Sequence, residues 1–438
     1  MKETSNRTGR GLAVALTLCS LFMPAAAQTA DEKIVELQKT VELLSGKLEA
    51  LEARQNVDEG RFSVQEEQAA DLSGRFTELQ SAPALDTHFD KFRFGGYGEL
   101  HANFTEGKGP DQIDLHRLVV YLGYEFTDWI QFHSEWEIEH GFVTDGAGGE
   151  FVIEQAYFDF LFSDLFNVRV GRVLTPLAIT NKWHEPTLFN SVERPSFDRF
   201  IIPTTWSSDG IGIFGNLSDA LSYEAYVVGG LNGSRFNAIN GIRGGRIKES
   251  PSLHDPAVTG RIDYYPLAAG DSTQSLRLGL SGYFGGLDNG NNGKNPGING
   301  DIGIYSADFQ YSHGRFDLLG ALAHTHVDGA RKIGNGTAEE MFGWYLEGAY
   351  HWLPDSWKTG KLARSDAVVF LRYDDFDTQY RMPSGVARNP AGDRNEWTVG
   401  LAYWPTPGVV IKADYQIPDD ATGDDLPHRI NFGIGFTF

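Results

Sequence analysis

Carboxylate side chains at alternate positions are the first residues in this sequence that could do chemistry. Within residues 130–140, Glu135, Glu137 and Glu139 alternate with apolar residues such as Trp136. Successive side chains of a β-strand point to opposite faces, so this segment predicts a strand with one acidic and one apolar face. Carboxylates repeated along one face could attract cations and set the electrostatic potential of a water-filled passage.

Arginines occur at strand positions that alternation places on the same polar faces. Those that we expect to form a basic wall are Arg169, Arg261, Arg277 and Arg372. Such a wall would attract anions. The alternative is mutual neutralisation, because Arg261 and Arg372 are each followed two positions later by an aspartate on the same strand face.

A third group of charges lies in residues 175–207, a long connection without a strand pattern. Its ionisable residues have both signs: Lys182, His184, Glu185, Glu193, Arg194, Asp198 and Arg199. Mixed charges on a loop that narrows a passage would set a transverse field on a passing ion, so we expect a constriction loop. The alternatives are an external lid and a loop that contacts a neighbouring subunit.

Motifs for catalysis or metal binding are missing from the sequence. There is no G-x-S-x-G nucleophile elbow and no P-loop. Ser134 and His140 share a strand but are separated by roughly 20 Å at the rise of a strand. His324 and His326 share a strand face without an identifiable third ligand. We therefore expect no enzymatic activity, no metal ion and no cofactor.

The element that must position these charges is a β-strand, repeated along the chain. Apolar and polar residues alternate in sixteen segments, at about 91–104, 113–126, 129–140, 150–161, 166–174, 208–215, 221–229, 257–265, 275–285, 301–311, 315–326, 341–351, 366–375, 395–404, 408–416 and 428–438. Short and long connections alternate between them. An even number of strands with short turns at one end is typical of a transmembrane barrel whose apolar side chains face lipid. The fold class predicted is therefore an all-β transmembrane barrel of about sixteen antiparallel strands.

The residues before the barrel follow other patterns. Residues 1–27 combine a basic start, a short apolar stretch and an A-x-A site, as in a secretory signal peptide. Residues 28–82 predict an α-helical coiled coil in the periplasm, with an apolar oligomerisation seam at Ile34, Leu37, Val41, Leu44, Leu48 and Leu51. The seam leaves dimer and trimer open. Residues 83–90 form a linker, and 91–438 the barrel.

Composition narrows the class further. The 438 residues carry a formal net charge of −22 and one cysteine, Cys19, which lies in the signal segment. The mean hydropathy of −0.31 excludes a protein with many membrane-spanning helices. The acidity argues against a nucleic-acid partner, because nucleic-acid backbones repel such a surface.

Several strand segments resemble one protein family. The phosphate-selective porin O/P family has segments similar to Phe94–His101, His116–Phe126, Glu135–His140, Glu154–Asp159, Gly171–Pro176 and Ile201–Trp206. A heptad segment before the barrel is similar to DcaP-like porins of that superfamily. The resemblance implies a homotrimer in the outer membrane of a Gram-negative bacterium, in contact with outer-membrane lipid.

The function implied is passive diffusion of small hydrophilic solutes or ions. Selectivity for anions such as phosphate or carboxylates is a hypothesis, since the resemblance itself says little about the solute. The chain departs from that expectation in one respect, because no single strand carries an uninterrupted ladder of arginines. The alternatives are a structural tether, in which the N-terminal segment binds cell-wall material, and a barrel enzyme.

Overall fold

A computed structural model describes residues 89–107, 111–141, 148–247, 252–267, 274–290, 298 and 300–438. Residues 91–438 form one compact unit. The predicted signal peptide at 1–27, the coiled-coil segment at 28–82 with its seam residues and nearly all of the linker at 83–90 lie outside the described residues. These three expectations therefore stay predictions.

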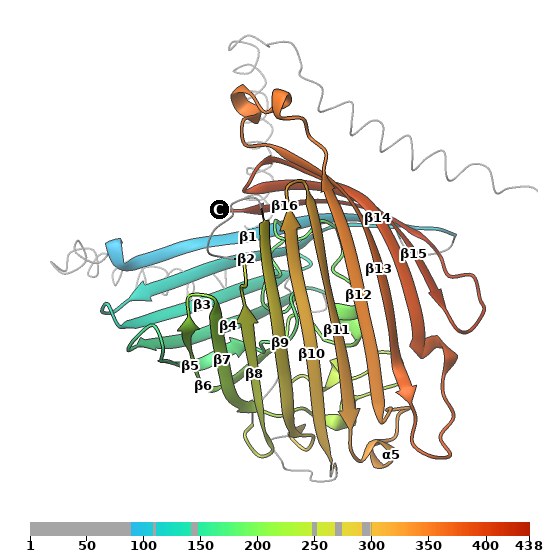
Figure 1. The fold of residues 1–438 in the computed structure, drawn as a ribbon. Helices are drawn as coiled ribbons and strands as arrows, with labels where there is room; N and C mark the ends of the chain where they lie inside the picture. The colour runs from blue at the N-terminus through green and yellow to red at the C-terminus, as the bar shows by residue number, and fades with distance from the viewer. Residues whose placement is uncertain are drawn as a thin grey trace, which may run out of the picture. The chain divides into compact units, whose positions relative to one another are not determined.

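Sixteen antiparallel strands form a closed barrel, as Figure 1 shows. The strands are β1 (Phe92–Thr105), β2 (Gln112–Glu125), β3 (Ile130–Glu139), β4 (Glu150–Leu161), β5 (Asn167–Leu174), β6 (Ser207–Ser218), β7 (Leu221–Gly229), β8 (Pro256–Tyr264), β9 (Gln274–Gly286), β10 (Asp301–His313), β11 (Phe316–Val327), β12 (Glu340–His351), β13 (Asp366–Arg381), β14 (Asp393–Thr406), β15 (Val409–Asp420) and β16 (Arg429–Thr437). Each strand pairs with its neighbours in the chain, and β16 pairs with β1. The predicted strand number and antiparallel barrel are confirmed.

Short helical turns occupy the connections. They are η2 (Phe89–Lys91), α4 (Phe197–Phe200), η3 (Gly233–Arg235), η4 (Arg243–Gly245), α5 (Ala330–Ile333), η6 (Asp355–Trp357), η7 (Gly360–Leu362) and η8 (Pro390–Gly392). Among the described residues, no helix has the length and apolar character needed to cross a membrane. The connections after odd-numbered strands leave one end of the barrel, which we call the long-loop end, and those after even-numbered strands leave the short-turn end.

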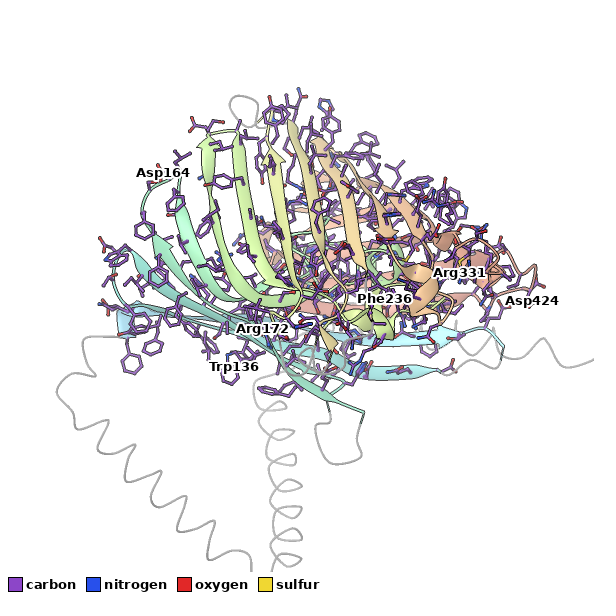
Figure 2. The ribbon with its side chains drawn as sticks, turned by 90° about the horizontal axis from the view of Figure 1, so that it is seen from below. Trp136, Asp164, Arg172, Phe236, Arg331 and Asp424 are labelled. Atoms are coloured by element: carbon purple, nitrogen blue, oxygen red, sulfur yellow. The ribbon has the colours of Figure 1, made fainter. Side chains whose placement is uncertain are left out.

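Burial on the strands is inverted relative to a soluble protein. In β3, Glu135 and Glu137 are 2% and 3% exposed, whereas Trp136 between them is 39% exposed. In β8, Arg261 is buried and the adjacent Ile262 is exposed. Figure 2 shows Trp136 on the outer side of the wall. Alternation therefore places apolar side chains outside and charged side chains inside, as in barrels whose outer face meets lipid.

Register shifts break the strict alternation of the wall in several strand pairs, and two of them lie beside the cavities described below. Where β1 pairs with β2, His116 is an extra residue that has no partner on β1. Where β3 pairs with β4, Glu154 is the extra residue and has no partner on β3. A bulge lets two successive side chains share one face. His116 and Arg117, and likewise Glu154 and Gln155, therefore all have polar contacts or cavities on the inner side.

Several strands are longer than the sequence predicts. β13 continues to Arg381, six residues beyond the expected end at 375, and β15 continues to Asp420. Four of the six added residues of β13 are polar (Asp377, Thr378, Gln379 and Arg381), so an apolar strand face is only weakly marked there. These polar extensions lie toward the long-loop end.

Candidate functional site

The connection between β5 and β6, residues 175–206, lies inside the barrel. Its backbone is held by inward side chains from widely separated strands: Val192 N–H donates to Asp414 of β15 at 2.6 Å, and Phe197 N–H donates to Asp374 of β13 at 3.2 Å. From the opposite direction, Ala178 N–H donates to Ser281 of β9 at 3.3 Å. We call residues 175–206 the inserted loop.

A second connection, residues 230–247 between β7 and β8, also enters the barrel. Thr378 of β13 donates a hydrogen bond to the carbonyl oxygen of Ala238 at 2.6 Å, and Arg394 of β14 donates to that of Ile239 at 2.5 Å. β13 and β14 are distant from β7 around the wall, so this segment crosses the interior. We call it the second inserted loop.

The two inserted loops build an apolar core within the barrel. Trp206 and Phe236, one from each loop, are 2% and 1% exposed, and the Trp206 ring packs on Tyr283 of β9 with centroids 4.8 Å apart. Figure 2 places Phe236 within the ribbon of the barrel. The cluster also includes inward residues of β10, such as Ile304. Part of the barrel interior is therefore packed like a protein core, and polar space is confined to the rest.

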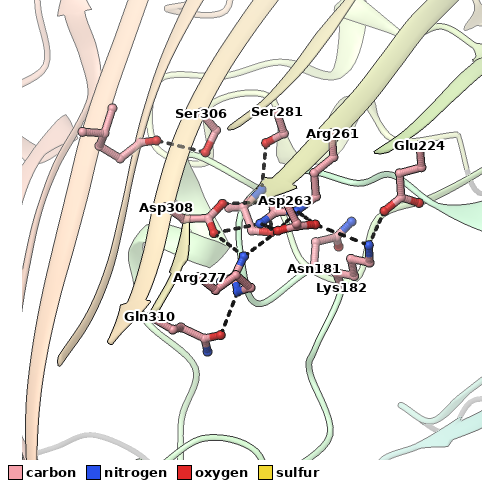
Figure 3. Close-up of polar contacts among 12 residues, drawn as sticks. Asn181, Lys182, Glu224, Arg261, Asp263, Arg277, Ser281, Ser306, Asp308 and Gln310 are labelled. Atoms are coloured by element: carbon pink, nitrogen blue, oxygen red, sulfur yellow. Dashed lines mark hydrogen bonds and ion pairs between the residues drawn. The ribbon is translucent and has the colours of Figure 1, made fainter. Parts of the chain in front are cut away.

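Arg261 and Arg277, both assigned to the predicted basic wall, lie in one ion-pair network with Asp263 and Asp308 (Figure 3). Arg261 is bonded to both aspartates at 2.7 and 2.8 Å, and its Nη1 also donates to the carbonyl oxygen of Ala178 at 2.9 Å. The network has two positive and two negative side chains. It therefore anchors the inserted loop to β8, β9 and β10 and has no excess charge.

The other two arginines of the predicted basic wall are paired as well. Arg169 makes two hydrogen bonds to Asp159, at 2.7 and 2.8 Å. Arg372 is 1% exposed, donates to Asp374 at 2.8 Å and also donates to Ser191 of the inserted loop. These contacts do not bring the four arginines into one surface, and the basic wall stays a prediction.

The predicted acidic face on β3 is divided among different partners. Glu137 accepts from Arg117 of β2 at 3.1 Å, and Glu139 lies 4.0 Å from the same guanidinium. Arg117 also pairs with Glu99 of β1 at 2.6 Å. Glu135 instead faces the inserted loop, where its Oε1 lies 3.6 Å from Nε2 of His184.

The ionisable residues predicted on the constriction loop all belong to the inserted loop. Lys182 pairs with Glu224 of β7, and the Tyr121 hydroxyl donates to Glu185 at 3.4 Å. Glu193 accepts from Asn103 of β1 at 2.9 Å. These contacts attach the loop to strands on both sides of the barrel, so its charges lie in the interior.

His184 and Glu193 have pKa values shifted by their partners. Burial lowers the pKa of His184, but the carboxylates of Glu154 and Glu135 outweigh it and raise the pKa to about 10. For Glu193, burial raises the pKa, and the imidazole of His101 outweighs it and holds the pKa well below its ordinary value. In the absence of a bound metal ion, both shifts favour the charged forms of the two side chains.

Asp198 is buried in the inserted loop, and its pKa predicts a pH-dependent stability. Thr180 donates to its Oδ2 at 2.6 Å, while burial raises its pKa from 3.8 to about 8. An acid with a raised pKa stabilises the folded state fully below 3.8 and loses that contribution as the pH rises to about 8. Asp198→Asn should remove this loss and make the protein more stable than wild type by about 1–3 kcal/mol at about pH 9.

Heat-induced unfolding, followed by gel mobility at about pH 5 and about pH 9, measures this effect. Because the loss begins above pH 3.8, the advantage of Asp198→Asn over wild type should be larger at the higher pH. An identical pH dependence in the two proteins would show that Asp198 is not protonated in the folded state.

Four arginines of the inserted loops line one cavity and make no ion pair with any carboxylate among the described residues: Arg194, Arg199, Arg243 and Arg246. We call them the loop arginines. Arg243 and Arg246 donate only to backbone carbonyl oxygens, including that of Thr204 at 3.4 and 3.0 Å. Burial and the neighbouring positive charges lower the pKa of Arg243 to about 10. The residues on the second inserted loop were missed by sequence reasoning.

Cavities lie on both sides of the inserted loop. One cavity, of about 800 Å³, lies toward the long-loop end and is lined by the four loop arginines together with Glu137, Glu139 and Glu154. A second cavity at that end, of about 340 Å³, is lined by Arg194 and Arg199 as well. Toward the short-turn end lie cavities of about 350 and 560 Å³, both lined by Lys182. The interior therefore offers polar, charged space above and below the inserted loop.

Comparison with known proteins supports the fold. No family model matches the chain. The OmpTdeltaL8 loop deletion mutant of OmpT, an outer membrane protein of Vibrio cholerae, has a TM-score of 0.50 at 11% identity and covers 79% of this chain and 99% of its own. Salmonella typhi OmpF in complex with daunomycin also has a TM-score of 0.50, at 12% identity, covering 79% of this chain and 97% of its own. At these identities the likeness concerns the barrel fold alone.

Sequence similarity identifies a nearer relative. A protein of Aquifex aeolicus (strain VF5), described as an "Uncharacterized protein", is 36% identical over 343 residues, which cover 74% of this chain and 75% of the relative. Similarity at this level over most of both chains reflects common descent and a common fold. The chain therefore belongs to the same protein family as this Aquifex aeolicus protein.

Proposed function

We propose that the protein is an outer-membrane porin through which small hydrophilic solutes and ions diffuse passively, with a preference for anions. The observation that carries the proposal is the position of the four loop arginines. They line the 800 Å³ cavity of a barrel whose outer wall is apolar and make no ion pair among the described residues. Arginine presents several donors to phosphate and carboxylate groups, which suits such anions.

The wall of the same cavity also carries acidic side chains. Whether the cavity attracts anions or cations therefore depends on which of its charged side chains are neutralised by ion pairs. Glu99 and Glu137 are both bonded to Arg117, so a large part of their charge is compensated. Within the described part of the chain, the guanidinium groups of Arg243 and Arg246 donate hydrogen bonds only to carbonyl oxygens, with carboxylates such as Glu139 at longer range. An ion in the cavity would therefore experience guanidinium groups from the loops opposed by partly neutralised carboxylates, and this difference favours anions.

The proposal includes a homotrimer in the outer membrane of a Gram-negative bacterium, with residues 28–82 in the periplasm. Its support is the heptad seam and the family resemblance of the strand segments. An outward ion pair agrees with a subunit contact: Arg172 and Asp209 are bonded at 2.7 Å on neighbouring strands, next to Ile211, which is 52% exposed on the outer face. Charges on an outer wall are costly against lipid and are better accommodated against protein.

Recordings from purified full-length protein in a planar lipid bilayer test the function. Discrete conductance steps are expected, with a zero-current potential in a potassium chloride gradient that has the sign for chloride. Absence of steps from protein whose folded mobility on a gel is intact would overturn the porin assignment. Conductance steps with a zero-current potential of the sign for potassium would support a porin but contradict the preference for anions.

A further inference from the structure

Glu135, Glu154 and His184 form a buried cluster where the inserted loop meets β3 and β4. Their ligand atoms all lie within 4.8 Å of one another. Nε2 of His184 is 3.6 Å from Glu135 Oε1 and 3.5 Å from Glu154 Oε2. All three side chains are 2–3% exposed. The bulge at Glu154 creates the cluster, because strict alternation along β4 would turn this carboxylate toward the outer face.

Most polar atoms of the cluster lack hydrogen-bond partners among the described residues. These atoms are both ring nitrogens of His184, both carboxylate oxygens of Glu154 and Oε1 of Glu135. Only Oε2 of Glu135 has one, the side-chain amide of Gln155 at 2.5 Å. Buried polar atoms are nearly always bonded, so a group of unpartnered acceptors facing one another points to a bound cation.

The spacing of the three ligand atoms suits a small divalent metal ion. Two ligands bound at about 2.1 Å in a tetrahedron lie about 3.4 Å apart. The two measured separations, 3.6 and 3.5 Å, are close to this value. Two carboxylates with a neutral imidazole carry a charge of minus two, which a divalent ion balances. We propose that Glu135, Glu154 and His184 bind a divalent transition-metal ion, with zinc, cobalt, manganese and iron(II) as the class that such nitrogen and oxygen ligands favour.

Access to the site is available from both ends of the barrel. Glu154 lines the 800 Å³ cavity at the long-loop end, whereas Glu135 and His184 line the 350 Å³ cavity at the short-turn end. The site therefore lies between the two cavities. A bound ion would fix the inserted loop to the wall there and would add positive charge close to Arg194, which donates to the carbonyl oxygen of His184 at 3.1 Å.

The competing occupant of the cluster is a proton on His184, which would form an ion pair with both carboxylates. A protonated imidazole satisfies both carboxylates and has no lone pair left for a metal ion. If this is the stable state of the cluster, no binding of zinc to it should be detected. A second group with metal-binding geometry, Asp114, His116 and His140, lies near the long-loop end and offers the matched control. It has the same kinds of ligand atoms and less burial, so a variant there tests whether any imidazole near a carboxylate suffices.

The experiment uses full-length protein in detergent, freed of metal with a chelator and purified without a histidine tag. Zinc chloride is titrated by calorimetry, and cobalt chloride is followed by its visible absorption. One ion per chain is expected, with His184→Gln and Glu154→Gln each weakening zinc binding by about tenfold or more. His140→Gln should leave the affinity unchanged.

Two results would overturn the site. One is wild-type protein that binds zinc no better than the His184→Gln/Glu154→Gln variant, which would leave the proton as the occupant. The other is loss of binding in His140→Gln with retention in His184→Gln, which would move the ion to the other cluster. Gel mobility before and after heating shows that each variant is folded, so loss of binding is separated from loss of fold. The readout is independent of conductance and therefore of the proposed porin function.

Discussion

Replacement of Arg243 and Arg246 by glutamine should shift the selectivity of the channel toward cations. Both side chains line the 800 Å³ cavity and have only carbonyl oxygens as partners among the described residues. A unit charge about 8 Å from a passing ion contributes about 0.5 kcal/mol in water-like surroundings. Loss of two such charges should therefore disfavour the anion and favour the cation by about 1 kcal/mol each, and so lower the ratio of anion to cation permeability by about thirtyfold. The zero-current potential in a potassium chloride gradient measures that ratio.

The matched control removes the same formal charge at a position away from the cavities. Lys361 and Arg364 are exposed in the connection between β12 and β13 at the short-turn end, and they line none of the four cavities. Lys361→Gln/Arg364→Gln should leave the zero-current potential near the wild-type value. Equal shifts in the two double variants would show that total charge, not the loop arginines, sets the selectivity.

The predicted basic wall of strand arginines makes a different forecast for the same measurement. On that hypothesis, Arg169→Ala and Arg261→Ala would alter selectivity more than changes at Arg243 and Arg246. The ion pairs of Arg169 with Asp159 and of Arg261 with Asp263 and Asp308 favour the loop arginines, because a paired guanidinium contributes less to the field in the cavity. Recordings of the two sets of variants under identical salt decide between the hypotheses.

The barrel could be predicted closely because its signal is local. Alternation of apolar and polar residues in a segment such as 150–161 reflects only whether each face of the strand meets lipid or the interior. In the structure, β4 has the predicted bounds. Prediction failed where alternation failed. The added ends of β13 and β15 are rich in polar residues, and the bulge at Glu154 exchanges the inner and outer faces for the residues on one side of it.

The interior could be predicted only in part because its contacts are long-range. The charged composition of residues 175–207 indicated a functional loop. Its partners on β8, β13 and β15 could not be predicted, because they depend on how the chain folds back across the barrel. The second inserted loop had no comparable signal, since residues 230–256 read as a Gly- and Asn-rich connection. One available clue was overlooked: strict alternation would place the carboxylate of Glu154 on the same face as Phe158 and Phe160, which signals a break in register.

Replacement of Arg261 by methionine should destabilise the protein by about 3–5 kcal/mol, because it leaves a buried negative charge without its partner. The guanidinium is 0% exposed and holds Asp263, Asp308 and the carbonyl oxygen of Ala178 together. Gly279 makes room for it, since a Cβ at that position would lie 2.0 Å from Nη2 of Arg261. Midpoints of unfolding in urea, measured in detergent, report the loss.

Two further variants separate the buried charge from the loss of an arginine in general. Arg172→Met removes the pair with Asp209, whose side chains are 29% and 38% exposed, and should cost about 0–1 kcal/mol. Arg261→Met/Asp308→Asn leaves Asp263 paired with Arg277 at 2.8 Å and restores neutrality, so it should recover much of the stability. If Arg261→Met were as stable as Arg172→Met, the network would not anchor the inserted loop. If the double variant recovered nothing, the hydrogen bond to Ala178, rather than charge balance, would account for the role of Arg261.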